Sequence, residues 1–148
     1  WWTEEDAAAF KARTDILVEQ FNKIVVLPAK DGQPAVMADR ALSLGENIAD
    51  QGGLRVAYTA FQNSLKDKGE PAPIDGFTAA QRFYLSYATI WGQNIRDEEA
   101  ARLTKTDVHS LGKNRVNATL RNVETFYDAF AITDGAMYLP EEERVVIW

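Results

Sequence analysis

Two acidic residues four positions apart, Glu46 and Asp50, stand in the string LGENIAD, inside a segment with a helical pattern of apolar residues. On a helix that turns by about 100° per residue, they lie about 40° apart and share a side with Gly53, Ala57 and Phe61. An ionised carboxylate on a buried face needs a metal ion, an arginine or lysine, or a protonated histidine; otherwise it takes up a proton. A structural salt bridge is the commonest of these outcomes, and a metal site is the one that would bring chemistry.

The same projection predicts which side of this helix faces the core. Leu42 and Ala49 flank the two acids, whereas Gln51 and Arg55 lie opposite, so we expect the acids to continue the core stripe. Ile48 is an exception, because it points away from that stripe.

The lone histidine, His109, lies with Asp107 in the polar string KTDVHS, and Arg115 follows shortly after in the chain. A single histidine in a predicted loop is most often a surface or core residue with one hydrogen bond. One histidine without any cysteine cannot build a zinc site, because such sites normally use about three protein ligands. If Glu46 binds a metal ion, the remaining ligands therefore lie outside this chain.

Helices must position these side chains, and the spacing of apolar residues predicts where they run. Thr3 is a plausible N-cap with three acids after it, and Thr78 and Gln81 form a capping-box pattern. The predicted helices cover about 3–24, 39–68, 78–91, 97–103 and 126–130, and the stretch 104–122 is polar and mixed.

Two of these helices have features that call for an explanation. Gly52 and Gly53 interrupt the second one, at about 1 kcal/mol each relative to alanine, so we expect a close neighbour or a bend there. The stretch 83–91 contains no charged residue, which predicts a helix buried on most sides, with a strand as the alternative that periodicity leaves open.

The composition excludes several classes of protein. The chain has 148 residues, which suits one domain, and 46% of them are hydrophobic. A net charge of −6 argues against nucleic-acid binding, and the lack of a long apolar segment argues against a membrane span. The lack of cysteine excludes disulfides and thiolate metal sites. The chain opens on WWTEED without a methionine or signal peptide, so we expect a piece of a longer polypeptide, with its apolar end, RVVIW, tucked into the fold.

Two strings of the sequence are similar to signatures of a known family. LGENIADQGGL closely resembles the third-ligand segment of the neprilysin-like zinc metallopeptidases, which include the endothelin-converting enzymes and bacterial oligopeptidases. KTDVHSLGKNRVNATL resembles their second signature, and the opening WWT, the F-x-x-A-F of 126–130 and the terminal Trp148 also agree. The resemblance covers essentially the whole chain. It implies a mainly α fold, the C-terminal helical subdomain of a thermolysin-like (gluzincin) metallopeptidase.

The resemblance implies a cofactor, one Zn²⁺, and assigns two residues to it. In this family two histidines of an HExxH helix and a glutamate on the next helix hold zinc, and Glu46 matches that glutamate. Asp50 matches the acid that hydrogen-bonds a ligand histidine and orients it.

The resemblance also implies residues that act on the substrate, a short peptide. His109 matches the residue that stabilises the oxyanion, and Asp107 would hold His109 in position. Arg115 matches the residue that binds the substrate carbonyl and contacts the acid at position 50. Ile90 and Trp91 match the far wall of the pocket for the apolar side chain after the scissile bond.

The sequence departs from the family pattern at several positions. No HExxH occurs, so the general base and two zinc ligands are absent, as is the substrate-binding edge strand with its Asn-Ala motif. Leu111 replaces the usual proline, Asn114 a phenylalanine and Ala118 a glycine. Vertebrate members are rich in disulfides, so the lack of cysteine suggests a bacterial parent.

These observations predict that residues 1–148 are the C-terminal part of a peptidase catalytic domain that is inactive alone and needs the upstream part of the same polypeptide. Family members act outside the cytoplasm or at membranes, so we expect a periplasmic, exported or cell-surface parent. Two alternatives stay open. One is a helical binding or structural module that has lost the zinc site, and the other is a plain helical domain whose acids pair with Arg115 or another base.

Overall fold

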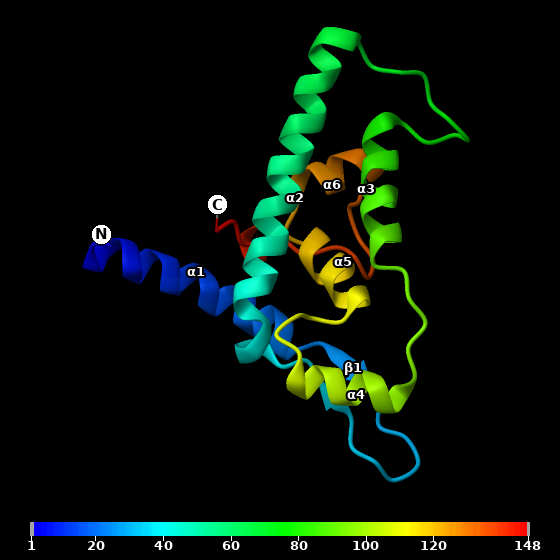
Figure 1. The fold of residues 1–148 in the computed structure, drawn as a ribbon. Coiled ribbons are helices and arrows are strands. Elements are labelled where there is room, and N and C mark those ends of the chain that lie inside the picture. Colours follow the sequence, from blue (N-terminus) through cyan, green and yellow to red (C-terminus); the bar gives the residue numbers. More distant parts are fainter. Residues whose placement is uncertain (1, 148) are drawn as a thin grey trace.

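The long helix α2 is the element around which the others are arranged (Figure 1). The computed structural model describes residues 2–147, apart from the side chain of residue 40, so the matches at Trp1 and Trp148 lie outside the described residues. The elements in chain order are α1 (Glu4–Asn22), β1 (Val25–Leu27), β2 (Val36–Met37), α2 (Arg40–Lys68), α3 (Ala79–Ile90), α4 (Asp97–Thr106), α5 (Gly112–Leu120), α6 (Glu124–Phe130) and a 3₁₀ turn, η1 (Glu141–Glu143).

Three helices begin where side-chain caps satisfy their first backbone N–H groups. Thr3 and Asp6 form a capping box on α1, and Thr78 and Gln81 form one on α3, as the sequence predicts for both N-caps. The Asp39 carboxylate accepts hydrogen bonds from the first turn of α2. These caps place the start of α2, and thereby the acids of α2, at a defined point in the fold.

Sequence analysis missed two parts of the structure, the hairpin and α5. The strands β1 and β2 pair antiparallel, with Val25 opposite Met37, and they are too short for a clear alternation of apolar residues. Most of the buried residues of helix α5 are small or polar, namely Gly112, Asn114, Ala118 and Thr119, and Leu120 at its end is the large apolar residue among them. Because one large apolar residue does not make a repeat, α5 shows no helical apolar period.

The prediction that the acids of α2 continue its core stripe is wrong. The buried face of α2 contains Ile48, which is 7% exposed, and Gln51, which is 1% exposed, although both were expected to point away. Glu46 lies to one side of that face, with 42% of its side chain exposed. Asp50 is more enclosed, at 11%. The core face of α2 is largely polar, so hydrophobicity alone identifies the wrong side.

Two clusters form the core and meet along α2. The first joins α1, α2, α5 and the C-terminal segment, and the second joins α2, α3, α5 and α6. Their buried members are Leu17, Phe21, Ile48, Ala118, Val145 and Ile147 in the first, and Leu54, Tyr84, Leu120, Val123, Phe126 and Tyr127 in the second. Burial of Val145 and Ile147 confirms that the apolar end of the chain is tucked into the fold.

Side-chain amides attach this C-terminal segment to the helices. Asn122 accepts hydrogen bonds from the Val145 N–H (2.9 Å) and from Gln20 Nε2 (3.0 Å), and it donates to Gln20 Oε1 (2.7 Å). Gln51 Nε2 donates to the Val145 carbonyl at 2.9 Å. Since Asn122 is 1% exposed, water cannot replace it as a partner.

Asn122→Ala should therefore lower the free energy of unfolding by about 2–3 kcal/mol, because it leaves the buried Val145 N–H without its acceptor and removes both hydrogen bonds to the Gln20 amide. Urea denaturation of the purified chain measures this loss. Asn117→Ala, which changes a less buried asparagine on α5, the helix that ends just before Asn122, should cost less than about 1 kcal/mol. If the two variants unfold at the same urea concentration, this role of Asn122 is contradicted.

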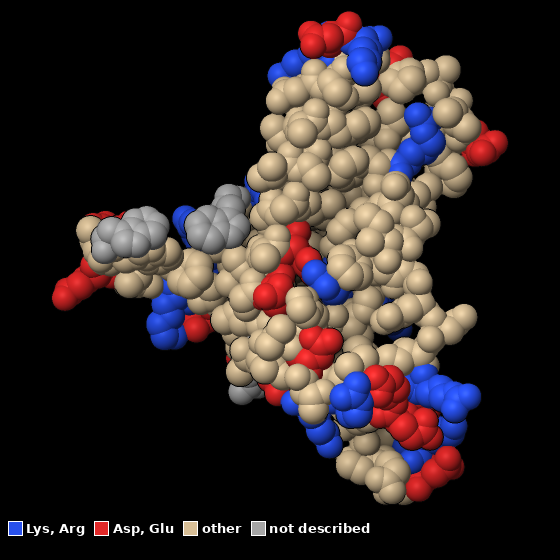
Figure 2. All heavy atoms as spheres, in the orientation of Figure 1, with Lys and Arg blue, Asp and Glu red and all other residues tan. Residues whose placement is uncertain are grey.

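An open groove runs between α2 and α3, so the expectation that 83–91 is buried on most sides is wrong. Leu85 is 39% exposed and Ile90 is 69% exposed, and Ile90 lies in this groove with Gly53 and Phe61 of α2. Figure 2 shows a broad uncharged surface over these two helices, with a group of acidic side chains beside its lower end. Helix α2 continues through its two glycines, and no atom lies within 4 Å of a Cβ built on Gly53. Within residues 2–147, no helix has the length and apolar character needed to cross a bilayer.

Candidate functional site

Helices α2 and α5 bring Asp50 and Arg115 together in a two-pronged ion pair. Arg115 Nε and Nη2 donate to the two Asp50 carboxylate oxygens at 2.7 and 2.6 Å. The side chains are 11% and 15% exposed, so the pair is largely shielded from solvent. Hydrogen bonding to Asp50 raises the pKa of Arg115 above its usual value, against the opposing effect of burial. The contact between position 115 and the acid at position 50 that the resemblance implies is present.

Trp91 supports the same guanidinium from its flat side. The carbon at the centre of the Arg115 guanidinium lies 3.7 Å from the centroid of the Trp91 ring, which is a cation–π contact. Trp91 directly follows the last residue of α3, and Ile90 beside it is exposed in the groove. The end of α3 therefore places one aromatic ring under Arg115 and one apolar side chain at the groove.

His109 lies between two carboxylates in the loop before α5. Its Nδ1 is 2.9 Å from Asp107 Oδ1, and its Nε2 is 3.3 Å from Glu46 Oε2. The same Asp107 oxygen accepts the His109 backbone N–H at 2.9 Å. These hydrogen bonds, the backbone one first, hold the pKa of Asp107 below its usual value, so this carboxyl is ionised at neutral pH. Both ring nitrogens of His109 therefore face a carboxylate oxygen.

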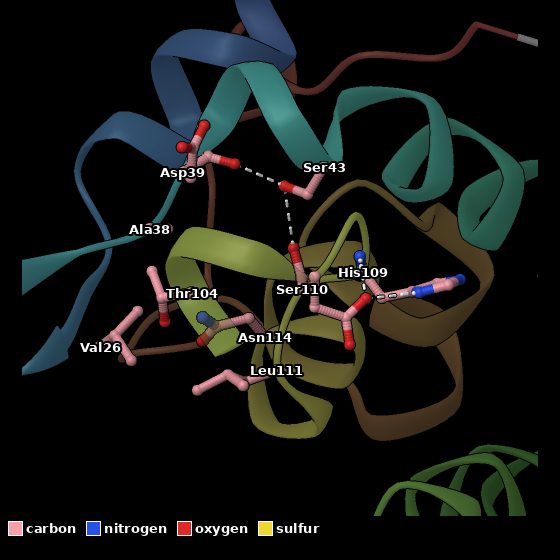
Figure 3. A pocket seen from close by; sticks show the side chains of 10 residues that line it. Val26, Ala38, Asp39, Ser43, Thr104, His109, Ser110, Leu111 and Asn114 are labelled. Carbon is pink, nitrogen blue, oxygen red and sulfur yellow. Dashed lines mark hydrogen bonds and ion pairs between the residues drawn. The ribbon is translucent and has the colours of Figure 1, made fainter. Parts of the chain in front are cut away.

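A polar cluster of Ser43, Asn47 and Ser110, which no motif in the sequence predicts, fixes this loop against α2, and Figure 3 shows its contact between Ser43 and Ser110. Ser110 Oγ donates to Asn47 Oδ1 at 2.8 Å and lies 3.3 Å from Ser43 Oγ. Asn47 Nδ2 donates to Ser43 Oγ at 3.1 Å, and both residues are buried. In the sequence, only the spacing of Ser43 and Asn47, two polar residues four apart on the helix that contains the acids, indicates this cluster. The cluster sets the distance between His109 and Glu46.

Gly112 makes the close approach of α5 to the end of α3 possible. A Cβ built on Gly112 would lie 2.6 Å from the Trp91 carbonyl oxygen and 3.2 Å from Gln93 Nε2. Such a contact forces the backbone of α3 and α5 apart, at a cost typical of overpacking.

We therefore expect Gly112→Ala to lower the free energy of unfolding by about 1–3 kcal/mol and to shift the fluorescence of Trp91. Gly45→Ala is the matched control, because no atom lies within 4 Å of a Cβ at this helical position. Gly45→Ala should leave stability unchanged or raise it by up to about 1 kcal/mol through helix propensity. If Gly112→Ala behaves like Gly45→Ala, the tight contact with Trp91 is wrong.

The side chains of the site can supply one of the ligands of a zinc ion. A glutamate carboxylate is an accepted zinc ligand, and Glu46 presents a half-exposed one at the surface. Within the described part of the chain, no three His, Asp or Glu side chains come together as a metal site would require. The chain therefore has the residue type for one ligand, and a complete site needs donors from elsewhere.

The chain is similar to known peptidases along its whole length. The model of peptidase family M13 matches residues 1–146. Human neprilysin is 35% identical over 150 residues and human endothelin-converting enzyme 1 is also 35% identical, each across 100% of this chain. The chain spans about a fifth of these relatives, namely 19% of neprilysin and 18% of endothelin-converting enzyme 1.

Solved structures show the same fold. The crystal structure of the Mycobacterium tuberculosis zinc metalloprotease Zmp1 in complex with an inhibitor superposes with a TM-score of 0.90 at 43% identity, over 100% of this chain and 22% of that one. PepO from Lactobacillus rhamnosis HN001 superposes with a TM-score of 0.77 at 29% identity, over 100% of this chain and 21% of that one. These matches confirm the mainly α fold class and the family that the sequence strings indicate.

Proposed function

This chain belongs to peptidase family M13, and we propose on that premise that residues 1–148 are the C-terminal part of the catalytic domain of a zinc endopeptidase that cleaves short peptides. The observation that supports the proposal most is the convergence of Glu46, Asp50, His109 and Arg115 beside an open groove. The matched relatives are about five times as long as the chain, so the remaining catalytic groups would come from the upstream part of the same polypeptide.

In this proposal Glu46 is the zinc ligand that this chain supplies. Zinc, when bound, would polarise the peptide carbonyl and activate a water molecule. Asp50 would orient a histidine ligand from the upstream part. Its two-pronged pairing with Arg115 fixes the direction of the carboxylate, which a hydrogen-bond acceptor for a ligand histidine requires.

His109 and Arg115 would act on the peptide itself. As water adds to the scissile carbonyl, negative charge develops on the carbonyl oxygen, and fixed donors beside it lower the barrier. Asp107 holds the His109 ring through Nδ1, and Nε2, on the side of Glu46, donates when the ring is protonated. The Arg115 guanidinium is held by Asp50 and Trp91 and can donate to a substrate carbonyl. Ile90 would contact the side chain that follows the scissile bond.

Hydrolysis of a short internally quenched peptide by the full polypeptide tests this proposal. We expect a chelator to abolish the activity and stoichiometric zinc to restore it. We expect residues 1–148 alone to be inactive and to bind zinc only weakly in equilibrium dialysis, because they contain one of the ligands. Activity that persists in excess chelator, or tight one-to-one zinc binding by this chain alone, would contradict it.

The second candidate is a non-catalytic helical module that has lost the zinc site. Its support is that Asp50 and Glu46 both find partners within the chain, Arg115 and His109 respectively. A zinc-free full polypeptide that still folds would favour this candidate. A periplasmic, exported or cell-surface location, and a bacterial origin, remain predictions from the family resemblance.

A further inference from the structure

Tyr87 lies on α3 beside the site, at a position that no motif in the sequence singles out. Its hydroxyl donates to the backbone carbonyl of Arg115 at 2.9 Å. Burial raises the pKa of Tyr87 to about 12, so the hydroxyl keeps its proton as a donor at neutral pH. The bond therefore connects α3 to the residue of α5 whose side chain is proposed to act on the peptide.

Tyr87 and Trp91 are four residues apart, so both lie on the same side of the last turn of α3. Tyr87 holds the backbone of Arg115, while Trp91 supports the flat side of the guanidinium at 3.7 Å. Asp50 binds the edge formed by Nε and Nη2. Among the described side chains, the guanidinium donates to Asp50 alone. Asp50 takes two of the five N–H groups, so both hydrogens of Nη1 and the second hydrogen of Nη2 stay available to a ligand.

We propose that Tyr87 is a positioning residue for Arg115, which acts with Trp91 to fix the direction in which Nη1 is presented to a peptide carbonyl. This inference rests on the proposed function. A tyrosine that only joined the two helices could donate its hydrogen bond to any accessible acceptor of α5. Tyr87 instead bonds the residue that is held by Asp50 and Trp91, so backbone and side chain of Arg115 are fixed from the same helix.

Tyr87→Phe in the full polypeptide removes the hydroxyl and keeps the ring. We expect kcat/KM for peptide hydrolysis to fall about three- to tenfold, the range of one neutral hydrogen bond, with most of the loss in kcat. Tyr84→Phe is the matched control. Tyr84 is another tyrosine of α3 with its pKa raised to about 12, but its hydroxyl pairs with Thr125 on α6. It should lower thermal stability to a similar extent and leave kcat/KM within about twofold.

A double-mutant cycle with Arg115→Lys separates positioning from general packing. Lysine keeps the charge for Asp50 but lacks the planar fork that Trp91 supports. If Tyr87 acts through Arg115, Tyr87→Phe should cost less than about twofold in the Arg115→Lys background. A full additive loss there, or an equal loss of kcat/KM in Tyr84→Phe, would overturn the positioning role alone. Wild-type activity of Arg115→Lys would instead refute the proposed role of Arg115, and with it this inference.

Discussion

Glu46→Ala in the full polypeptide is expected to lower zinc content to less than about a tenth of the wild-type value and to abolish peptide hydrolysis. The expected loss exceeds the 10- to 100-fold typical of residues that only support a ligand, because one of about four zinc ligands is removed. Metal analysis of the purified variant, together with its kcat/KM, measures both effects. Zinc that stays stoichiometric in Glu46→Ala would show that the ligand assignment is wrong.

Two comparisons make this result specific to the ligand. Asp67→Ala removes an exposed carboxylate from the last turn of the same helix, about 30 Å away along its axis, and should leave zinc and activity unchanged. Glu46→Asp keeps the carboxylate on a shorter side chain and should retain more zinc than Glu46→Ala. Because Glu46 is half exposed, neither change at this position should unfold the protein.

Arg115→Ala has the second-largest expected effect, on stability as well as activity. Loss of the donor to the developing oxyanion should lower kcat/KM by about 10²–10³-fold. The change also leaves the Asp50 carboxylate, 11% exposed, without its partner. Breaking such a pair typically costs about 3–5 kcal/mol of folding free energy. Peptide hydrolysis and urea denaturation should therefore both respond.

Arg115→Lys separates the two consequences. Lysine restores a positive charge opposite Asp50, so most of the stability should return, but it cannot reproduce the two-pronged bond or the contact with Trp91. We expect kcat/KM to remain at least about tenfold below wild type. If activity returns in parallel with stability, Arg115 holds the fold together and has no part in catalysis.

The site could be predicted from the sequence only where short strings identify a family. The strings around Glu46 and His109 led to the residues that the structure places together, although 63 positions separate Glu46 from His109 in the chain. Nothing in the composition pointed to Tyr87, or to the pairing of Ser110 with Asn47, because a hydrogen bond between distant segments has no local pattern. The roles of these residues in catalysis stay predictions.

The fold was predictable where helices have caps and large apolar side chains, as in α1 and α3. It was not predictable in α5, whose buried residues are small or polar except for Leu120 at its end. The helical projection of α2 failed for a related reason. That helix has a polar buried face with Gln51, and an apolar uncovered face with Ala57 and Phe61 in the groove. The apolar stripe of α2 therefore lines the groove of the candidate site and does not face the core.

The most direct measurement is a crystal structure of the full polypeptide with anomalous diffraction recorded at the zinc edge. The account predicts one anomalous peak with a Glu46 carboxylate oxygen about 2.0–2.2 Å from it, at the distance of a direct zinc ligand. It also predicts histidine ligands from the upstream part, one of them hydrogen-bonded to Asp50. A zinc peak far from Glu46, or Glu46 still paired with His109 and no peak beside it, would contradict the account.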